Sequence, residues 1–161
     1  MVTHSELMPR IGEWALASRR HIVIVDSDPS AALVTQRGLQ RLLGDSATVD
    51  LAPTPGAAWL RCVRDHVDLV IVDPSPQSRG AAALVKALHD ERPSIPVLVL
   101  TAYDTPRLRT QMRALGVRHY LAKPVDLPTL KQSVHGALMV HSHAEGENNA
   151  DQTSSSGSAA D

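Results

Sequence analysis

Short apolar runs alternate along the chain with segments in which apolar residues recur at helical spacing. The apolar runs predict five strands, at residues 22–25, 48–51, 69–72, 97–100 and 120–122. The helical segments are marked by Leu39, Leu42, Leu43, Leu60, Val63, Leu84, Leu88, Leu108, Met112, Leu115, Leu127, Leu130, Val134 and Leu138. Predicted N-caps stand at Asp28, Thr54, Thr105 and Asp126, and Pro follows the first three directly. The pattern therefore predicts five strands alternating with five helices.

Three of the predicted strands, 22–25, 69–72 and 97–100, are apolar at every position. Strands covered by helices on both faces show this continuous pattern, because neither face meets water. Together with the alternation of strands and helices, it predicts an α/β fold built on a doubly wound parallel sheet.

The two ends of the chain differ from this central region. Residues 141–161 contain no apolar residue larger than Ala, so we expect a disordered acidic tail there. Residues 1–20 show helical spacing that Pro9 and Gly12 interrupt, so we expect an N-terminal extension with one short helix. Residues 21–140 then form one domain of ordinary size.

Charge balance and cysteine count narrow the class of protein. Sixteen Lys and Arg against seventeen Asp and Glu give a net charge of −1, which does not favour a nucleic-acid partner. The single Cys62 can form neither an internal disulfide nor a thiolate metal cluster. No apolar run approaches the ~18 residues of a membrane helix, and the N-terminus lacks a signal-peptide pattern. We therefore expect a cytoplasmic protein with no membrane and no nucleic-acid contact.

Chemically active side chains follow four of the predicted strands. Asp26 and Asp28 follow the first strand, Asp73 the third, Thr101 the fourth and Lys123 the fifth. In a doubly wound sheet the ligand site lies beyond the carboxyl ends of the strands, so we expect these groups to converge there. A single Asp after a strand is a turn former about as often as it is a functional residue. Four strand ends that all carry chemically active side chains are harder to explain as turns.

Clustered carboxylates with a nearby lysine suit Mg²⁺ and phosphate chemistry. Carboxylate oxygens are ligands that Mg²⁺ prefers, and a carboxylate beside the metal can accept a phosphoryl group. Lys123 would neutralise the incoming charge, while the Thr101 hydroxyl and the Ala102 N–H could bind phosphoryl oxygens. The residues at this edge thus predict phosphoryl transfer to an aspartate.

Residues 21 to about 140 resemble a response-regulator receiver domain. Four segments in the expected order carry the resemblance: His21-Ile-Val-Ile-Val-Asp26, Val67-Asp-Leu-Val-Ile-Val-Asp73, Val97-Leu-Val-Leu-Thr101-Ala102, and Gly116-Val-Arg-His-Tyr120-Leu-Ala-Lys123-Pro124. The resemblance implies a flavodoxin-like sheet of five strands in the order 2-1-3-4-5, with five helices covering both faces.

The resemblance also implies a role for each matching residue. Asp73 is the phospho-acceptor, Asp26 belongs to the acid pocket, and Lys123 binds the phosphoryl group. Thr101 is the switch hydroxyl and Tyr120 the switch aromatic. Metal ligands implied for a Mg²⁺ ion are Asp26, Asp73 and the backbone carbonyl of Ser75.

Three departures from the family pattern concern the metal and phosphoryl sites. Ser27 stands where the family has a second acid, which should weaken Mg²⁺ binding unless Asp28 substitutes or instead caps the next helix. Pro74 after Asp73 has no N–H to offer a phosphoryl oxygen. The following loop has its Pro and Gly one residue early, which could displace the carbonyl of Ser75.

The leading interpretation is a single-domain response regulator, phosphorylated by a histidine kinase or phosphotransfer protein, that signals through an unidentified output protein. Only 21 residues follow the domain, too few for a helix-turn-helix module. Such a protein is not an enzyme beyond slow self-catalysed phosphotransfer and dephosphorylation. One alternative is an unphosphorylated pseudo-receiver that binds proteins. A remote one is a haloacid-dehalogenase-like phosphatase, because Asp26-Ser27-Asp28 resembles its Asp-x-Asp motif.

A basic surface is predicted beside the switch residues. Between Thr105 and Lys123 the chain carries five basic residues and no acid, a local charge of +5. Arg107, Arg109 and Arg113 are therefore the predicted partner face, suited to an acidic protein surface. The sequence also leaves a homodimer open.

Overall fold

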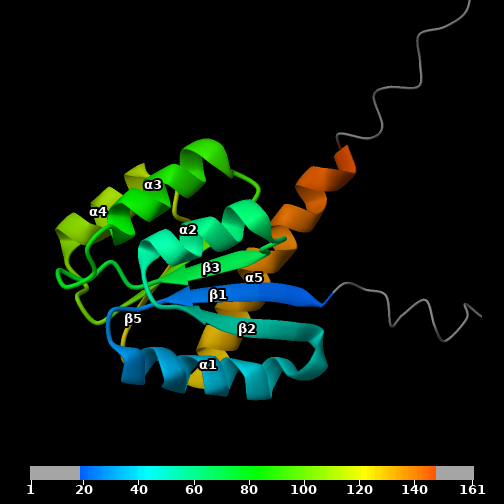
Figure 1. The fold of residues 1–161 in the computed structure, drawn as a ribbon, viewed down its shortest axis with the longest axis horizontal. Helices are drawn as coiled ribbons and strands as arrows, with labels where there is room; N and C mark the ends of the chain where they lie inside the picture. The colour runs from blue at the N-terminus through cyan, green and yellow to red at the C-terminus, as the bar shows by residue number, and fades with distance from the viewer. Residues whose placement is uncertain (1–18, 148–161) are drawn as a thin grey trace, which may run out of the picture.

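The computed structural model describes residues 19–147, which form one α/β domain (Figure 1). Its strands are β1 Arg20–Val25, β2 Ala47–Ala52, β3 Leu69–Val72, β4 Val97–Thr101 and β5 His119–Ala122. Its helices are α1 Pro29–Leu43, α2 Pro55–Arg64, α3 Ala81–Glu91, α4 Pro106–Ala114 and α5 Leu127–Glu147, with a short 3₁₀ turn, η2, at Gly44–Ser46. All strand pairs are parallel, in the order β2-β1-β3-β4-β5. The predicted fold class and strand order are confirmed.

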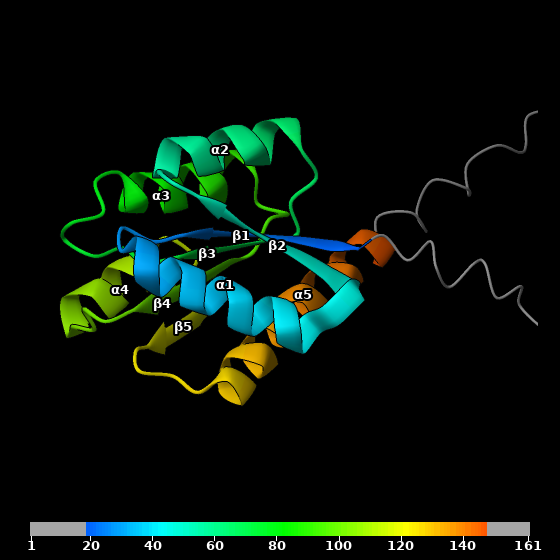
Figure 2. The same cartoon turned by 60° about the horizontal axis from the view of Figure 1, so that its bottom comes forward.

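Helices cover both faces of the sheet, as the continuous apolar strands predict (Figures 1 and 2). Val23 and Val25 of β1 point to one face and pack with residues of α2, α3 and α4. Ile22 and Ile24 point to the other face and pack with residues of α1 and α5. Because successive side chains of a strand alternate in direction, a strand buried on both sides must be apolar throughout.

The predicted N-caps fix where four helices begin. Asp28 accepts hydrogen bonds from two backbone N–H groups of α1, and Thr54 and Thr105 each accept one from α2 and α4. Asp126 accepts one from the backbone N–H of Thr129 in α5. The first turn of a helix has N–H groups without intrahelical partners, which these oxygens satisfy. Helix α3 instead follows Gly80, whose φ of 87° favours glycine.

The end of α5 corrects the predicted tail boundary. The helix continues to Glu147 and so includes seven residues of the segment that we expected to be disordered, 141–147. Extending a formed helix adds one hydrogen bond for each residue ordered, and Ala144, Glu145 and Glu147 are good helix formers. The segments 1–18 and 148–161 lie outside the described residues, so the expectations for them are untested. Between residues 19 and 147, no helix combines the length and apolar composition needed to cross a membrane.

Candidate functional site

The four chemically active strand ends meet at one edge of the sheet. Asp26 follows β1, Asp73 follows β3, Thr101 ends β4 and Lys123 follows β5. Backbone bonds extend the strand pairing into these ends: the N–H of Asp73 donates to the carbonyl of Val25 at 3.0 Å, and that of Lys123 to the carbonyl of Thr101 at 2.8 Å. The parallel sheet therefore brings together residues that lie as far as 97 positions apart in the chain.

Lys123 lies between the two carboxylates of this edge. Its Nζ is 2.7 Å from Oδ2 of Asp26 and 3.2 Å from Oδ2 of Asp73. Both carboxylate side chains are nearly buried, each 6% exposed, and that of Lys123 is 20% exposed. Burial opposes the charge on Lys123, but the hydrogen bonds and the negative charges of both carboxylates outweigh it and raise the lysine pKa.

One carboxylate oxygen of Asp73 has no partner. Oδ2 contacts Lys123, whereas the buried Oδ1 accepts no hydrogen bond from any described residue. A buried acceptor is normally satisfied, so an orphan oxygen of this kind indicates a site for a ligand that supplies positive charge. A cation or an electrophilic phosphorus atom has this property.

Asp28 is the next residue to place, because the sequence left open whether it binds a metal or caps α1. Its carboxylate caps α1 instead of turning toward the pocket, and its backbone N–H donates to Oδ1 of Asp26 at 2.9 Å. Pro29 directly after Asp28 makes it an N-cap, because Pro suits the first helical position. Of the two roles considered for Asp28, the structure shows the cap.

The carboxylates that remain for a metal are those of Asp26 and Asp73. The hydroxyls of Ser27 and Ser75 face each other across 3.1 Å, and the Ser75 carbonyl accepts a hydrogen bond from the N–H of Ser78 at 2.9 Å. Within residues 19–147 no group of three or more His, Cys, Asp or Glu side chains is placed to hold a metal. The orphan oxygen of Asp73 beside Asp26 fits Mg²⁺, an ion that keeps several waters and needs few protein ligands.

Thr101 and Tyr120, the two predicted switch residues, both contact the loop 102–105. Thr101 is fully buried, and its Oγ1 accepts a hydrogen bond from the backbone N–H of Tyr103 at 3.0 Å. The Tyr120 hydroxyl donates to Oδ1 of Asp104 at 3.0 Å. Burial, then the hydrogen bond and charge of Asp104, raise the pKa of Tyr120 to about 12. Ala102, whose N–H was predicted to bind phosphoryl oxygens, is exposed beside Thr101.

Asp104 is the residue that sequence reasoning missed. It accepts hydrogen bonds of 2.7 Å from Nε and Nη2 of Arg109, and Arg109 stacks on the Tyr120 ring at 4.6 Å from its centre. The sequence did carry a signal for this contact: Asp104 directly precedes the N-cap Thr105 and stands five residues before Arg109. The count between Thr105 and Lys123 began one residue too late to include this acid.

The predicted charge of +5 on the partner face is therefore wrong. Asp104 neutralises Arg109, and Lys123 binds the two acids of the pocket and does not belong to that surface. Arg107 and Arg113 are exposed, and neither forms an ion pair with another residue between 19 and 147. The basic character of α4 is weaker than the sequence indicates.

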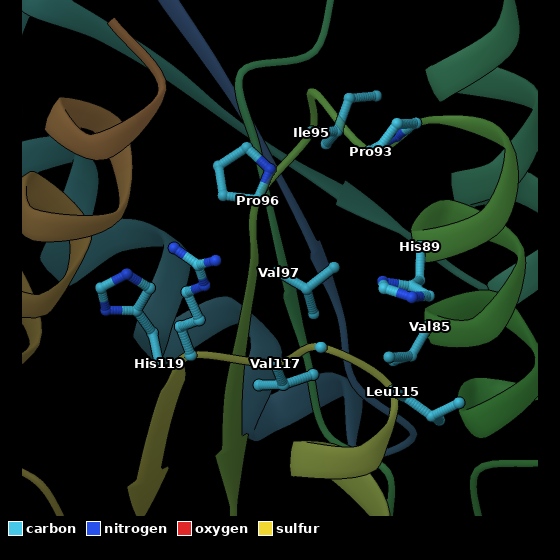
Figure 3. Close-up of a pocket in the computed structure, with 11 residues that line it drawn as sticks. Val85, His89, Pro93, Ile95, Pro96, Val97, Leu115, Val117 and His119 are labelled. Atoms are coloured by element: carbon cyan, nitrogen blue, oxygen red, sulfur yellow. The ribbon is translucent and has the colours of Figure 1, made fainter. Parts of the chain in front are cut away.

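An apolar hollow of about 400 Å³ lies at the opposite, amino edge of the sheet (Figure 3). Its walls are the end of α3, the start of β4 and the turn before β5, with Val85, His89, Val97, Leu115 and Val117 among its lining residues. No carboxylate lines it, so it does not contribute to the chemistry of Asp73.

Comparison with known proteins identifies the family. A family model described as the response regulator receiver domain matches residues 22–135. The chain belongs to this family. The four strand-end residues, Asp26, Asp73, Thr101 and Lys123, all lie inside the matched range of this receiver domain.

Curated relatives of this receiver domain are longer proteins. The transcriptional regulatory protein ZraR of Escherichia coli K12 is 33% identical over 124 residues, which cover 76% of this chain and 27% of ZraR. GlrR of the same strain is 32% identical over 123 residues, covering 73% of this chain and 26% of GlrR. The chain thus spans about a quarter of the length of these relatives.

Solved structures agree with the fold. The signal receiver domain of an HD domain-containing protein from Pseudomonas fluorescens Pf-5 superposes with a TM-score of 0.69 at 27% identity, over 78% of this chain and 98% of that one. The signal receiver domain of a putative LuxO repressor protein from Vibrio parahaemolyticus gives 0.72 at 18% identity, over 81% and 98%. At the lower identity the likeness concerns the fold alone.

Proposed function

We propose that this receiver domain accepts a phosphoryl group on Asp73 from a histidine kinase or phosphotransfer protein and signals through a partner protein. The observation that carries the proposal is the asymmetry of Asp73. Its Oδ2 is held by Lys123, while its buried Oδ1 has no partner among the described residues. A fixed carboxylate with one free oxygen is arranged for nucleophilic attack.

In the proposed step, Oδ1 of Asp73 forms a bond to phosphorus as the bond from phosphorus to the imidazole nitrogen of the donor histidine breaks. The electron pair of that bond goes to the imidazole nitrogen, and the imidazole leaves in its neutral form because it keeps the proton on its other ring nitrogen or takes one up from solvent. Lys123 then faces the added phosphoryl charge. Asp26 and Asp73, with the Ser75 carbonyl as the third ligand that the family resemblance implies, would hold Mg²⁺, and the ion would supply further positive charge.

The hydroxyl of Thr101 is the second group that we assign to the phosphorylated state. It accepts a hydrogen bond from the N–H of Tyr103, and its own proton is still available for donation to a phosphoryl oxygen. In the proposed response Thr101 moves toward Asp73 to donate this bond, and its contact with Tyr103 transmits the movement to the loop 102–105. Tyr120 lies on β5 against Arg109 of α4, the helix proposed to meet the partner. A change at Thr101 thereby alters the surface around Arg107 and Arg113. We include a cytoplasmic location in this proposal, because the protein must meet its phosphoryl donor there.

A pseudo-receiver is the second candidate function, and two observations favour it. The Ser27 and Ser75 hydroxyls bond to each other where the family has an acid, and Pro74 offers no N–H. The phosphatase alternative loses support, because Asp28, its required acid, caps a helix that begins at the next residue.

The deciding experiment is incubation with acetyl phosphate and Mg²⁺, followed by intact mass measurement. We expect one phosphoryl group on the wild type and on the control variant Asp65→Asn, which changes an exposed aspartate on α2's C-cap. Asp73→Asn should take up none. Uptake by Asp73→Asn would contradict the assignment, and no uptake by the wild type would favour the pseudo-receiver.

A further inference from the structure

The side chains of Asp104, Arg109 and Tyr120 form a closed cluster at the start of α4. Asp104 accepts two hydrogen bonds of 2.7 Å from Arg109 and one of 3.0 Å from the Tyr120 hydroxyl. The guanidinium of Arg109 stacks on the Tyr120 ring, 4.6 Å from its centre. Each of the three side chains therefore contacts the other two.

The same short loop also holds Thr101. Tyr103 donates its backbone N–H to the Thr101 hydroxyl, and Asp104 next to it binds Tyr120. Thr101 and Tyr120 lie on adjacent strands, since Val99 of β4 pairs with Tyr120 of β5. A displacement of Thr101 toward Asp73 thus pulls on the loop that fixes Tyr120.

The geometry of the cluster makes it stronger than an ordinary surface ion pair. Exposed pairs contribute little because water screens them and long side chains lose freedom. Here the pair is bidentate, the Asp104 side chain is only 29% exposed, and an aromatic ring covers one side of the guanidinium. Such a contact can hold a side chain in one orientation.

We propose that Asp104 is a positioning residue that holds Tyr120 and the loop 102–105 in the unphosphorylated arrangement, and so restrains the switch. The inference rests on the proposed phosphorylation of Asp73. A contact that exists in only one of two states stabilises that state and so lowers the population of the other state. Removing the Asp104 carboxylate should therefore increase the population of the state that accepts phosphate.

The contact itself can be tested without phosphorylation. Tyr120 is the only tyrosine left in a Tyr103→Phe background. At neutral pH the nuclear magnetic resonance signal of its ring carbon ζ reports the hydrogen bond of the hydroxyl. We expect Asp104→Ala to move this signal toward that of free tyrosine, and the control Asp90→Ala, which breaks the Lys86–Asp90 ion pair on α3, to leave it in place. An unmoved signal in Asp104→Ala would overturn the proposal.

The restraint is tested by the rate of phosphorylation from acetyl phosphate with Mg²⁺. Asp104→Ala should react about fivefold faster than the wild type, a typical coupling between two sites, and Asp90→Ala should match the wild type. In a Tyr120→Phe background the gain should shrink, because the hydroxyl that Asp104 holds is already gone.

A rate unchanged by Asp104→Ala would show that the cluster only stabilises the fold, and an equal gain in the Tyr120→Phe background would show that Asp104 acts by another route. Either result overturns the proposal. Failure of the wild type to take up any phosphoryl group, with the carbon signal moving as expected, would instead overturn the proposed function.

Discussion

The hydroxyls of Ser27 and Ser75 share a hydrogen bond of 3.1 Å beside the acid pocket. This contact joins the end of β1 to the loop after β3 without any charge. At the position of Ser27 the family has an acid that would attract the metal ion, whereas here a neutral hydroxyl bonds to another hydroxyl. The pocket therefore keeps the proposed acceptor Asp73 with Lys123, whereas its proposed metal side has a serine where the family has a second acid.

Ser27→Asp should tighten Mg²⁺ binding. A carboxylate beside Asp26 adds a full charge near the metal, and even after screening by water we expect at least about tenfold higher affinity, ~1.4 kcal/mol. Isothermal titration with Mg²⁺ measures it. Ser94→Asp is the matched control, because it adds the same charge to an exposed serine before β4, at the opposite edge. Equal affinities for Ser27→Asp and the wild type would contradict the view that Ser27 weakens the site.

Lys123→Met should destabilise the domain by roughly 3 kcal/mol at neutral pH, because it leaves two nearly buried carboxylates without their cation. Urea unfolding measures the change. Lys86→Met is the control: it removes a lysine from an exposed ion pair on α3 and should change stability little. A loss no greater than that of the control would show that the carboxylates do not depend on Lys123.

The stability difference between the wild type and Lys123→Met should depend on pH. The pKa of Lys123 is raised above its ordinary value of 10.5 in the folded state. Its stabilising contribution is therefore complete below 10.5 and is lost as the pH rises through the higher folded pKa. The difference in unfolding free energy between wild type and Lys123→Met should stay constant from neutral pH up to that region and shrink above it. A difference that grew with alkaline pH would have the wrong sign.

The parts of the fold and site that follow from local pattern could be predicted from the sequence. A strand such as Leu69–Val72, apolar at every position, has few alternatives to burial between two helical layers. Once the sheet is parallel, the residues after its strands must share an edge, so the contact of Lys123 with Asp26 and Asp73 needed no further information. That Asp28 caps α1 could also be predicted, because Pro29 directly after it suits the first position of a helix.

The parts that depend on how elements pack could not be predicted. Asp104 meets Tyr120 because the loop 102–105 returns from the end of β4 toward the neighbouring strand β5, and sequence spacing does not set the path of that loop. The neutralisation of Arg109 was missed for the same reason. The position where α5 ends depends on small differences in helix propensity between residues. An existing helix extends more readily than a new one forms.

Gly116→Ala should destabilise the domain while leaving phosphorylation of Asp73 intact. Gly116 ends α4 with a φ of 81°, in the left-handed region where a side chain is strained. An added Cβ would also lie 2.6 Å from Nδ1 of His89 on α3, closer than two such atoms can approach. We expect a loss of about 1–3 kcal/mol in urea unfolding.

The two causes can be separated with His89→Ala, which removes the exposed ring beside Gly116. In that background Gly116→Ala should cost less, since only the backbone strain is left; the difference between the two losses measures the contact. An equal loss in both backgrounds would show that the ring simply moves aside. Because this turn lies at the amino edge of β5 and the acceptor at the carboxyl edge, the extent of acetyl phosphate labelling, measured well below the melting temperature, should equal that of the wild type. Reduced labelling of a folded Gly116→Ala protein would mean that the start of β5 influences Lys123 at its end.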